Sequence, residues 1–423
     1  MRWVTKLVFA FTASTGLTAA HAAEPVRTLA GAPGISGQQD GVGGIARFAD
    51  PAGLAMDSAG NILIADSGNH CLRMLTPSGT VSTFAGIAGD PGATDGTAAT
   101  ARFDTPSSLA LASDGTLFIS DTGNHTVRRL DLSGRVTTFA GSAGSAGATD
   151  GTATTARFNS PLGLAIAVDG SLFVADSGNH AIRRIDSKGT VTTFAGNLEG
   201  WGSSDGNAST ARVNGPVGLA FDPAGNLFVA DSFNHAIRRI TPNGTVTTFA
   251  GKLGEDGFLD GAGGEARFGT PAELALDRRG NLFVADAFYH TLRKITPSGQ
   301  VSTIAGLAGA DGNMDGAYSA SRFFNPYGLV SSPSGSLILS DTYNETVREV
   351  VAPFALSVRS AGKDSPVIQW ESVPGQRYQV YQRDTLAAPW TPMGAPVTAS
   401  LTTTEVRDTA SQPTRFYQVD RVP

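Results

Sequence analysis

The fold of this chain of 423 residues is decided by a stretch that begins at Pro51 and reads PAGLAMDSAGNILIADSGNHCLRMLTPSGTVSTFAG. Five further copies follow at intervals of 55 residues, with no insertion or deletion between them. A sequence period of this length indicates a solenoid or a propeller before any other fold. The counterparts of Pro51 are Pro106, Pro161, Pro216, Pro271 and Pro326.

Each copy carries the local signals of four short β-strands. In the fourth copy, apolar runs at 218–222 and 226–231 and alternating runs at 236–241 and 245–250 are separated by turns rich in Gly, Pro, Asn and Ser. Such runs are typical of strands that are joined by tight turns. Four antiparallel strands of this kind make one blade of a propeller.

The two ends of the repeat region indicate that the copies close into a ring. Copies one to five end in VSTFAG, VTTFAG or VSTIAG, whereas the sixth copy has no such strand. A matching VRTLAG stands at 26–31, one period before the first of these strands. An open solenoid would not need this displaced strand, but a ring would, because pairing it leaves no open sheet edge. The sequence therefore predicts an all-β, six-bladed β-propeller whose N-terminal strand completes the last blade.

The composition agrees with this fold and excludes other classes of protein. Glycine makes up 52 residues, above the usual ~7%, but without the Gly-X-Y period of collagen. Charged residues are 16% of the chain and hydrophobic residues 41%, which argues against a disordered protein. The net charge is −6 without any cluster of Lys and Arg, so we expect no nucleic-acid partner. The single cysteine, Cys71, permits neither an intrachain disulfide nor a multi-cysteine metal site.

The first 22 residues read as an export signal. Arg2 and Lys6 precede an apolar stretch, and small residues at 20 and 22 form the pattern of a signal peptide that is cleaved after Ala22. A membrane anchor is the alternative, although the apolar stretch is short and contains Thr, Ser and Gly. We expect a periplasmic or extracellular protein without stable membrane insertion after signal removal, with the propeller at 23–352.

A different pattern covers 353–423, after the repeats end. Segments at 367–373, 377–384, 403–409 and 415–422 alternate like strands, which predicts a small β-sandwich. We expect its core to contain the aromatic residues Trp370, Tyr378, Tyr381, Trp390 and Tyr417.

The repeat resembles a known family. Its central motif, GNLFVADSFNHAIRRI in the fourth copy, is similar to the NHL repeat, which is named for an Asn-His-Leu core. Copies one to four contain Asn-His, copy five has Tyr289-His290, and copy six has Asn344-Glu345. The linking pattern D-G-x-x-x-x-A-R-F-x-x-P-x-G-L is similar to that of secreted bacterial NHL proteins. Over 26–350 the resemblance implies a propeller, but the family includes protein- and RNA-binding scaffolds, and its structural relatives include metal-dependent lyases and lactonases.

The C-terminal segment resembles a known module as well. Its pattern W-x-x-x-P-G-x-x-Y-x-V, followed by a later Trp and by F-Y-x-V, looks like the fibronectin-III-like modules of secreted bacterial proteins. The resemblance implies a spacer or an adhesive appendage. The alternative is an extension that packs on the propeller without a partner of its own.

The histidines suggest a metal site that the geometry of a propeller disfavours. The turn between the second and third strands of a blade shares a face with the loop between blades, and five of the six histidines occupy that turn. Strands ~4.8 Å apart place such a ring at a radius of roughly 12 Å, whereas zinc needs ligands at ~2 Å. We therefore expect the histidines to form hydrogen bonds within the turns, and we expect no metal or other cofactor. The alternatives are zinc at the ring of histidines and calcium at the Asp-Gly loops. The histidines are His70, His125, His180, His235 and His290.

Aspartate and arginine recur with the same period. Asp66 and Arg73 flank the central hairpin of the first copy, and Asp40 and Arg47 flank the loop between blades. Carboxylate and guanidinium groups form strong, directional hydrogen bonds, so we expect both pairs to be structural clamps and not catalytic acids. The hairpin positions are Asp66, Asp121, Asp176, Asp231, Asp286 and Asp341, with Arg73, Arg128, Arg183, Arg238, Arg293 and Arg348.

Binding is expected where one copy departs from the others. Aromatic residues replace small ones in copies four to six, and acidic residues replace Gly and His at single positions. Loops carry binding on rigid scaffolds, and grouped aromatic side chains make binding patches. Simple filling of space is the alternative explanation. The predicted binding residues are Trp201, Phe233, Glu273, Phe288, Tyr289, Tyr343 and Glu345.

These observations favour a binding protein over an enzyme. An active site needs unlike residues that converge, but the polar positions are nearly uniform and predict no catalytic residue. We expect an exported, monomeric, non-enzymatic scaffold that engages a protein, peptide or glycan on the face with the long loops. The alternative is a metal-dependent lyase or lactonase-type hydrolase with its site at the central channel.

Overall fold

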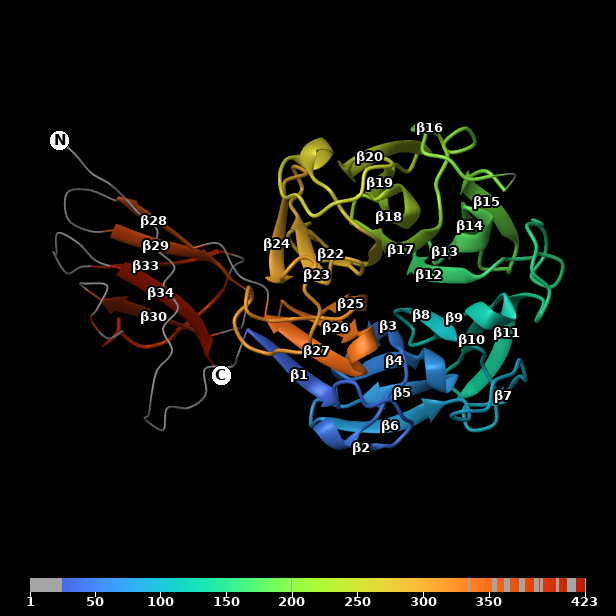
Figure 1. Cartoon of the computed structure of the whole chain (residues 1–423), viewed down its shortest axis with the longest axis horizontal. Helices are drawn as coiled ribbons and strands as arrows, with labels where there is room; N and C mark the ends of the chain where they lie inside the picture. Colours follow the sequence, from blue (N-terminus) through green and yellow to red (C-terminus); the bar gives the residue numbers. More distant parts are fainter. Residues whose placement is uncertain are drawn as a thin grey trace.

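Six antiparallel sheets stand around a central axis (Figure 1). The computed structural model describes residues 25–198, 200–333, 335–351, 356–360, 366–372, 377–383, 388, 391–400, 403–408 and 416–422. The predicted export signal at 1–22 lies outside these residues. Within them the regular elements are strands and 3-10 turns, which confirms the all-β prediction, and no helix there is long and apolar enough to cross a membrane.

Each blade runs from an innermost strand outward. The first contains β3 (Pro51–Met56), β4 (Ile62–Asp66), β5 (Cys71–Leu75) and β6 (Thr80–Ala85), with β2 (Gly41–Val42) at its edge. The second contains β8 (Pro106–Leu111), β9 (Leu117–Asp121), β10 (Thr126–Leu130) and β11 (Arg135–Gly141), with β7 (Gly96–Thr97) at its edge. The third contains β12 (Pro161–Ile166), β13 (Leu172–Asp176), β14 (Ala181–Ile185) and β15 (Val191–Gly196).

The remaining blades repeat this order. The fourth contains β17 (Pro216–Phe221), β18 (Leu227–Asp231), β19 (Ala236–Ile240) and β20 (Thr245–Gly251), with β16 (Gly206–Asn207) at its edge. The fifth contains β21 (Pro271–Leu276), β22 (Leu282–Asp286), β23 (Thr291–Ile295) and β24 (Val301–Gly306). The sixth contains β25 (Pro326–Ser331), β26 (Ser336–Asp341) and β27 (Thr346–Val351), and β1 (Val26–Gly31) is its fourth strand.

The pairing of β1 with β27 confirms that the N-terminal strand completes the last blade. Val26 pairs with Val350, and Gly31 pairs with Thr346. Phe48 of the first blade and Ile338 and Val347 of the sixth share one hydrophobic cluster, so the seam is packed like the other junctions. Closing the ring in this way protects the outer edge of the sixth blade.

The edge pairing extends beyond the four expected strands. The glycine after each loop aspartate pairs with the outermost strand of its blade, as Gly41 does with Val81 and Gly316 does with Val26. In three blades this pairing lengthens into a two-residue strand. The sequence did not predict it because two residues are too few to show an alternating pattern.

Close backbone approach fills the centre of the ring. The innermost strands of neighbouring blades lie against one another. A Cβ atom at Gly163 would stand 2.0 Å from the carbonyl oxygen of Val217, and one at Gly328 would stand 2.0 Å from that of Ala52. Packing between blades therefore requires glycine at Gly163 and Gly328.

Residues after 355 form two further sheets beside the ring (Figure 1). One contains β28 (Leu356–Ser360), β29 (Pro366–Glu371) and β33 (Thr403–Arg407), and the other β30 (Arg377–Arg383), β31 (Thr391–Pro392), β32 (Val397–Thr398) and β34 (Phe416–Val422). Trp370 and Tyr378 are buried, and their ring centroids are 5.8 Å apart. Tyr381 is half-buried. Trp390 and the side chain of Tyr417 lie outside the described part of the chain.

Candidate binding face

The face with the long loops is built on a repeated tight turn. The residue that follows the 3-10 turn between the second and third strands of a blade adopts a left-handed backbone, with φ of 56° at His70 and 57° at Glu345. In the fifth blade the equivalent residues form turns without a 3-10 helix. The turns are η2 (Ser67–Asn69), η3 (Thr122–Asn124), η4 (Ser177–Asn179), η5 (Ser232–Asn234) and η7 (Thr342–Asn344), and the long loops add η1 (Gly43–Ile45) and η6 (Gly263–Glu265).

A buried aspartate holds each turn to its own blade. Asp66 is fully buried and accepts hydrogen bonds from the backbone N–H of Ala49 at 2.8 Å and from Asn69 Nδ2 at 2.8 Å. Arg73 Nη1 donates to the same carboxylate at 2.9 Å. Burial raises the pKa of Asp66 to about 6, and these donors oppose the shift. The carboxylate is thus engaged on all sides.

The arginine of this pair also holds the loop between blades. Arg73 Nη2 lies 2.6 Å from Asp40 Oδ1, and its guanidinium carbon stands 5.4 Å from the ring centroid of Phe48. The loop pairing therefore differs from the expected one, since Asp40 bonds to Arg73 and not to Arg47. Arg47 Nη1 instead donates to backbone carbonyls, including that of Gly44 at 2.6 Å.

The histidines join neighbouring blades. The Nδ1 atom of His70 accepts the backbone N–H of Thr105, in the next blade, at 3.1 Å. In the sixth copy the carboxylate of Glu345 replaces the imidazole and accepts the N–H of Asp50 at 2.7 Å. Burial raises the pKa of Glu345 to about 7. Among the described residues no group of three or more His, Cys, Asp and Glu side chains could hold a metal ion.

The fifth blade departs from this scheme. Tyr289 stands where the other blades have the asparagine, and its hydroxyl donates to Asp256 at 3.1 Å. Asp286 therefore lacks the amide donor and accepts the backbone N–H of Thr270 at 3.1 Å. Its distance to Arg293 Nη1 is 3.4 Å, against 2.9 Å or less in the other blades. The clamp is looser here than elsewhere.

Aromatic side chains gather where the clamp is loosened. The ring centroid of Tyr289 lies 5.2 Å from that of Phe258 and 5.1 Å from that of Phe288. The ring of Phe324 lies 5.2 Å from Tyr343 and 5.5 Å from that of His290, the residue after Tyr289. Phe258, Phe288 and Tyr343 are 58%, 60% and 53% exposed. We call Phe258, Phe288, Tyr289, Phe324 and Tyr343 the aromatic surface.

The predicted binding residues are only partly brought together. Phe288, Tyr289 and Tyr343 belong to the aromatic surface. Phe233 is exposed on the adjoining turn, over Gly215, and Trp201 is 68% exposed without a described ring contact. Glu345 lies at the junction with the first blade. Glu273 does not join them, because its side chain is only 7% exposed on the innermost strand β21.

Two members of the aromatic surface were missed from the sequence. Phe258 stands where the other copies have Gln, Ala, Ala, Ser and Asn, and Phe324 stands where they have Ala, Asp, Asn, Asn and Gly. Both are therefore departures from the repeat of the same kind as Phe288. Applying the comparison to every loop position would have found them.

Four segments match the family description "NHL repeat": 48–74, 103–130, 158–185 and 213–240. These four segments of the chain are similar to the NHL repeat. The NHL repeat-containing protein 2 of Homo sapiens is 27% identical over 322 residues, which cover 68% of this chain and 44% of that protein. The protein SUPPRESSOR OF QUENCHING 1, chloroplastic, of Arabidopsis thaliana is 27% identical over 338 residues, which cover 76% of this chain and 31% of that protein. The chain thus spans less than half the length of these two relatives.

Two solved structures of similar fold come from Bacteroides thetaiotaomicron VPI-5482. A protein of unknown function from Bacteroides thetaiotaomicron has a TM-score of 0.61 at 22% identity, over 77% of this chain and 74% of that one. An auxiliary nutrient binding protein from the same organism has a TM-score of 0.59 at 17% identity, over 77% of this chain and 75% of that one. These similarities agree with the β-propeller fold of this chain.

Proposed function

We propose that this NHL-repeat propeller is an exported, non-enzymatic binding protein that engages a protein, peptide or glycan through the aromatic surface. The observation that supports it is the grouping of exposed aromatic rings at the one blade whose polar clamp is loosened. Aromatic rings supply a large contact area at small loss of conformational entropy, and they dominate binding hot spots.

Fold analogy supports the general role of binding and no particular ligand. One propeller of similar fold is described as an auxiliary nutrient binding protein. We further propose that 23–352 form the exported propeller after removal of 1–22, and that 353–423 form a fibronectin-III-like β-sandwich. Arg279 of the fifth blade, whose Nη2 donates to the carbonyl of Ser372 at 2.8 Å, would anchor this module.

The proposal is tested by retention of the purified chain on arrays of oligosaccharides and peptides. The test variant combines Phe258→Ser, Phe288→Gly and Tyr343→Gly, each of which introduces a residue found in another copy. We expect its retention to fall more than about tenfold, since hot-spot residues each contribute on the order of 2 kcal/mol.

A matched control combines Leu132→Ser and Val168→Ser on the opposite face. Their side chains are 78% and 95% exposed, so the control removes apolar surface without touching the aromatic surface. Equal losses in both variants, or no retention of the unchanged chain by either array, would contradict the proposal.

A metal-dependent lyase or hydrolase is the second candidate. Elemental analysis of the purified chain distinguishes it from a binding protein: stoichiometric zinc or calcium, whose removal abolishes a lyase or lactonase activity, would overturn the non-enzymatic assignment.

A further inference from the structure

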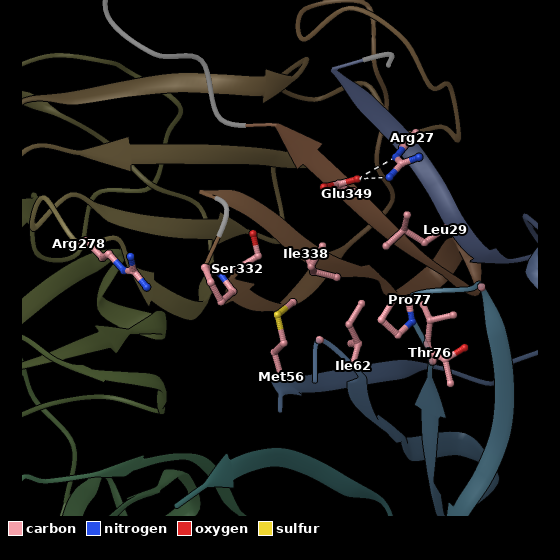
Figure 2. A pocket seen from close by; sticks show the side chains of 14 residues that line it. Arg27, Leu29, Met56, Ile62, Thr76, Pro77, Arg278, Ser332, Ile338 and Glu349 are labelled. Carbon is pink, nitrogen blue, oxygen red and sulfur yellow. Dashed lines mark hydrogen bonds and ion pairs between the residues drawn. The ribbon is translucent and has the colours of Figure 1, made fainter. Parts of the chain in front are cut away.

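A pocket of about 620 Å³ opens on the face with the short turns, where the sixth blade meets the first (Figure 2). Its walls come from β1, β26 and β27 on one side and from β3 to β5 on the other, with Arg278 reaching in from the fifth blade. This face is opposite the aromatic surface. The volume is that of a site for a small molecule, which usually measures about 300–1,000 Å³.

Less bulky side chains occupy this junction than the junction of the third and fourth blades. At the junction of the third and fourth blades, the equivalent space is filled by three phenylalanines. The ring of Phe173 stands 4.9 Å from that of Phe194 and 5.0 Å from that of Phe221. At the seam the corresponding residues are Ile338, Leu29 and Met56.

The lining combines an apolar wall with the hydroxyl groups of Thr76 and Ser332 and with charged side chains at its two ends. Leu29, Met56, Ile62 and Ile338 form an apolar wall in Figure 2. At one end Arg27 Nη2 is paired with Glu349 at 2.6 Å.

The cation at the other end is unpaired. Figure 2 shows Arg278 beside Ser332, facing Met56 across the pocket. Arg278 has no ion-pair or hydrogen-bond partner among the described residues. The other copies have Ser, Val or Pro at its position, so among the six copies only the fifth has a cation there.

We propose that this seam pocket binds a small molecule with a branched or aromatic apolar body and a single carboxylate. The apolar body lies against Met56, Ile62 and Ile338, and the carboxylate accepts hydrogen bonds from Arg278. Guanidinium groups hold carboxylates by paired, charge-assisted hydrogen bonds. The Arg27–Glu349 pair closes the far end and leaves Arg278 as the free cation.

The experiment is isothermal titration of the full chain with 4-phenylbutyrate and with uncharged 4-phenylbutan-1-ol. We expect the carboxylate to bind about fivefold more tightly, the upper range for an ion pair at an exposed arginine. Arg278→Gln should remove that preference and leave the binding of the alcohol unchanged. Arg135→Gln, which removes an equal charge at an exposed side chain outside the pocket, should leave both affinities unchanged.

A second pair of variants tests the apolar wall. Ile338→Phe introduces the residue of blades two to five, and Leu29→Phe introduces that of blades one to four, so each fills the pocket with a side chain that the repeat already accepts. We expect either variant to weaken both probes more than tenfold at an unchanged melting temperature. Should one variant fold poorly, the other decides. Failure of the unchanged chain to bind either probe, wild-type affinities in the filled variant, or a carboxylate preference that survives Arg278→Gln would overturn the proposal.

Discussion

A carboxyl group at the centre of the ring should make the stability of this protein fall as the pH rises. Glu273 stands on β21 where the other blades have Gly or Ser, and its side chain is 7% exposed. Its Oε2 atom has no hydrogen-bond partner among the described residues. Burial raises the pKa of Glu273 from 4.5 to about 8, and burial, with a smaller contribution from the neighbouring Glu273, raises the pKa of Tyr327. The folded chain therefore keeps a proton that the unfolded chain loses.

The size of the effect follows from the two pKa values of Glu273. Between pH 4.5 and 8 the folded state binds more protons than the unfolded state, so the free energy of unfolding decreases as the pH rises. Each pH unit in this window removes about 1.4 kcal/mol, and the slope halves near the folded pKa. From pH 6 to pH 8 the loss at this site is about 2 kcal/mol.

The assay is urea unfolding of the unchanged chain and of Glu273→Gln at pH 6, 7 and 8. Glutamine approximates the neutral acid in shape and does not titrate, so the advantage of the variant should grow by about 2 kcal/mol across the series. Other shifted groups, such as Glu345 with a pKa of about 7, are common to both proteins and cancel in the difference. Parallel pH profiles for the two proteins would refute the reasoning.

Three further changes test the clamps. Arg238→Met should lower the free energy of unfolding by about 3–5 kcal/mol, because it leaves the buried Asp231 without the guanidinium that lies 2.7 Å away. The control Arg135→Met changes an exposed side chain and should alter the free energy of unfolding by less than about 0.5 kcal/mol in the same urea titration. Thr122→Val should lower the free energy of unfolding by about 1 kcal/mol in the same titration, since the hydroxyl of Thr122 donates to the carbonyl of Pro161 at 2.6 Å. An unchanged unfolding midpoint would count against this hydrogen bond between blades. Tyr289→Asn should raise the melting temperature in calorimetry, because asparagine at this position donates to the buried aspartate of the other five blades at 2.8 Å; a lower melting temperature would argue against the loosened clamp.

The blades could be predicted because the same strand and turn pattern occurs in six copies of the repeat. A strand boundary that is ambiguous in one copy is fixed by the other five, and VRTLAG at 26–31 is recognisable only by comparison with them. The partner of Asp40 could not be predicted in this way. Sequence spacing alone does not distinguish Arg47 from Arg73 as the partner of Asp40. In the structure Arg73 lies 2.6 Å from Asp40, and its guanidinium packs on Phe48.

The sites differ in how visible they are in the sequence. Aromatic residues in place of glycine stand out, as Phe288 does. Glu273 also departs visibly from the repeat sequence. Its burial on the innermost strand is not visible there, because the sequence does not show that the side chain points away from solvent. The seam pocket leaves almost no signal, since replacing phenylalanine by Leu29 or Ile338 keeps the apolar pattern and removes only volume.

The loosened fifth blade makes binding a better explanation of the aromatic surface than the filling of space. Side chains that merely fill space should be buried and should leave the hydrogen bonds around them intact. Here Phe288 is 60% exposed, and the neighbouring Tyr289 displaces the amide that elsewhere satisfies the buried aspartate. Ala287 also lacks the hydroxyl with which Thr342 reaches the carbonyl of Pro51. This blade replaces the amide donor of the buried aspartate and lacks the interblade hydroxyl bond, at the place where its apolar rings face solvent. Such departures from local rules of stability are expected at functional sites.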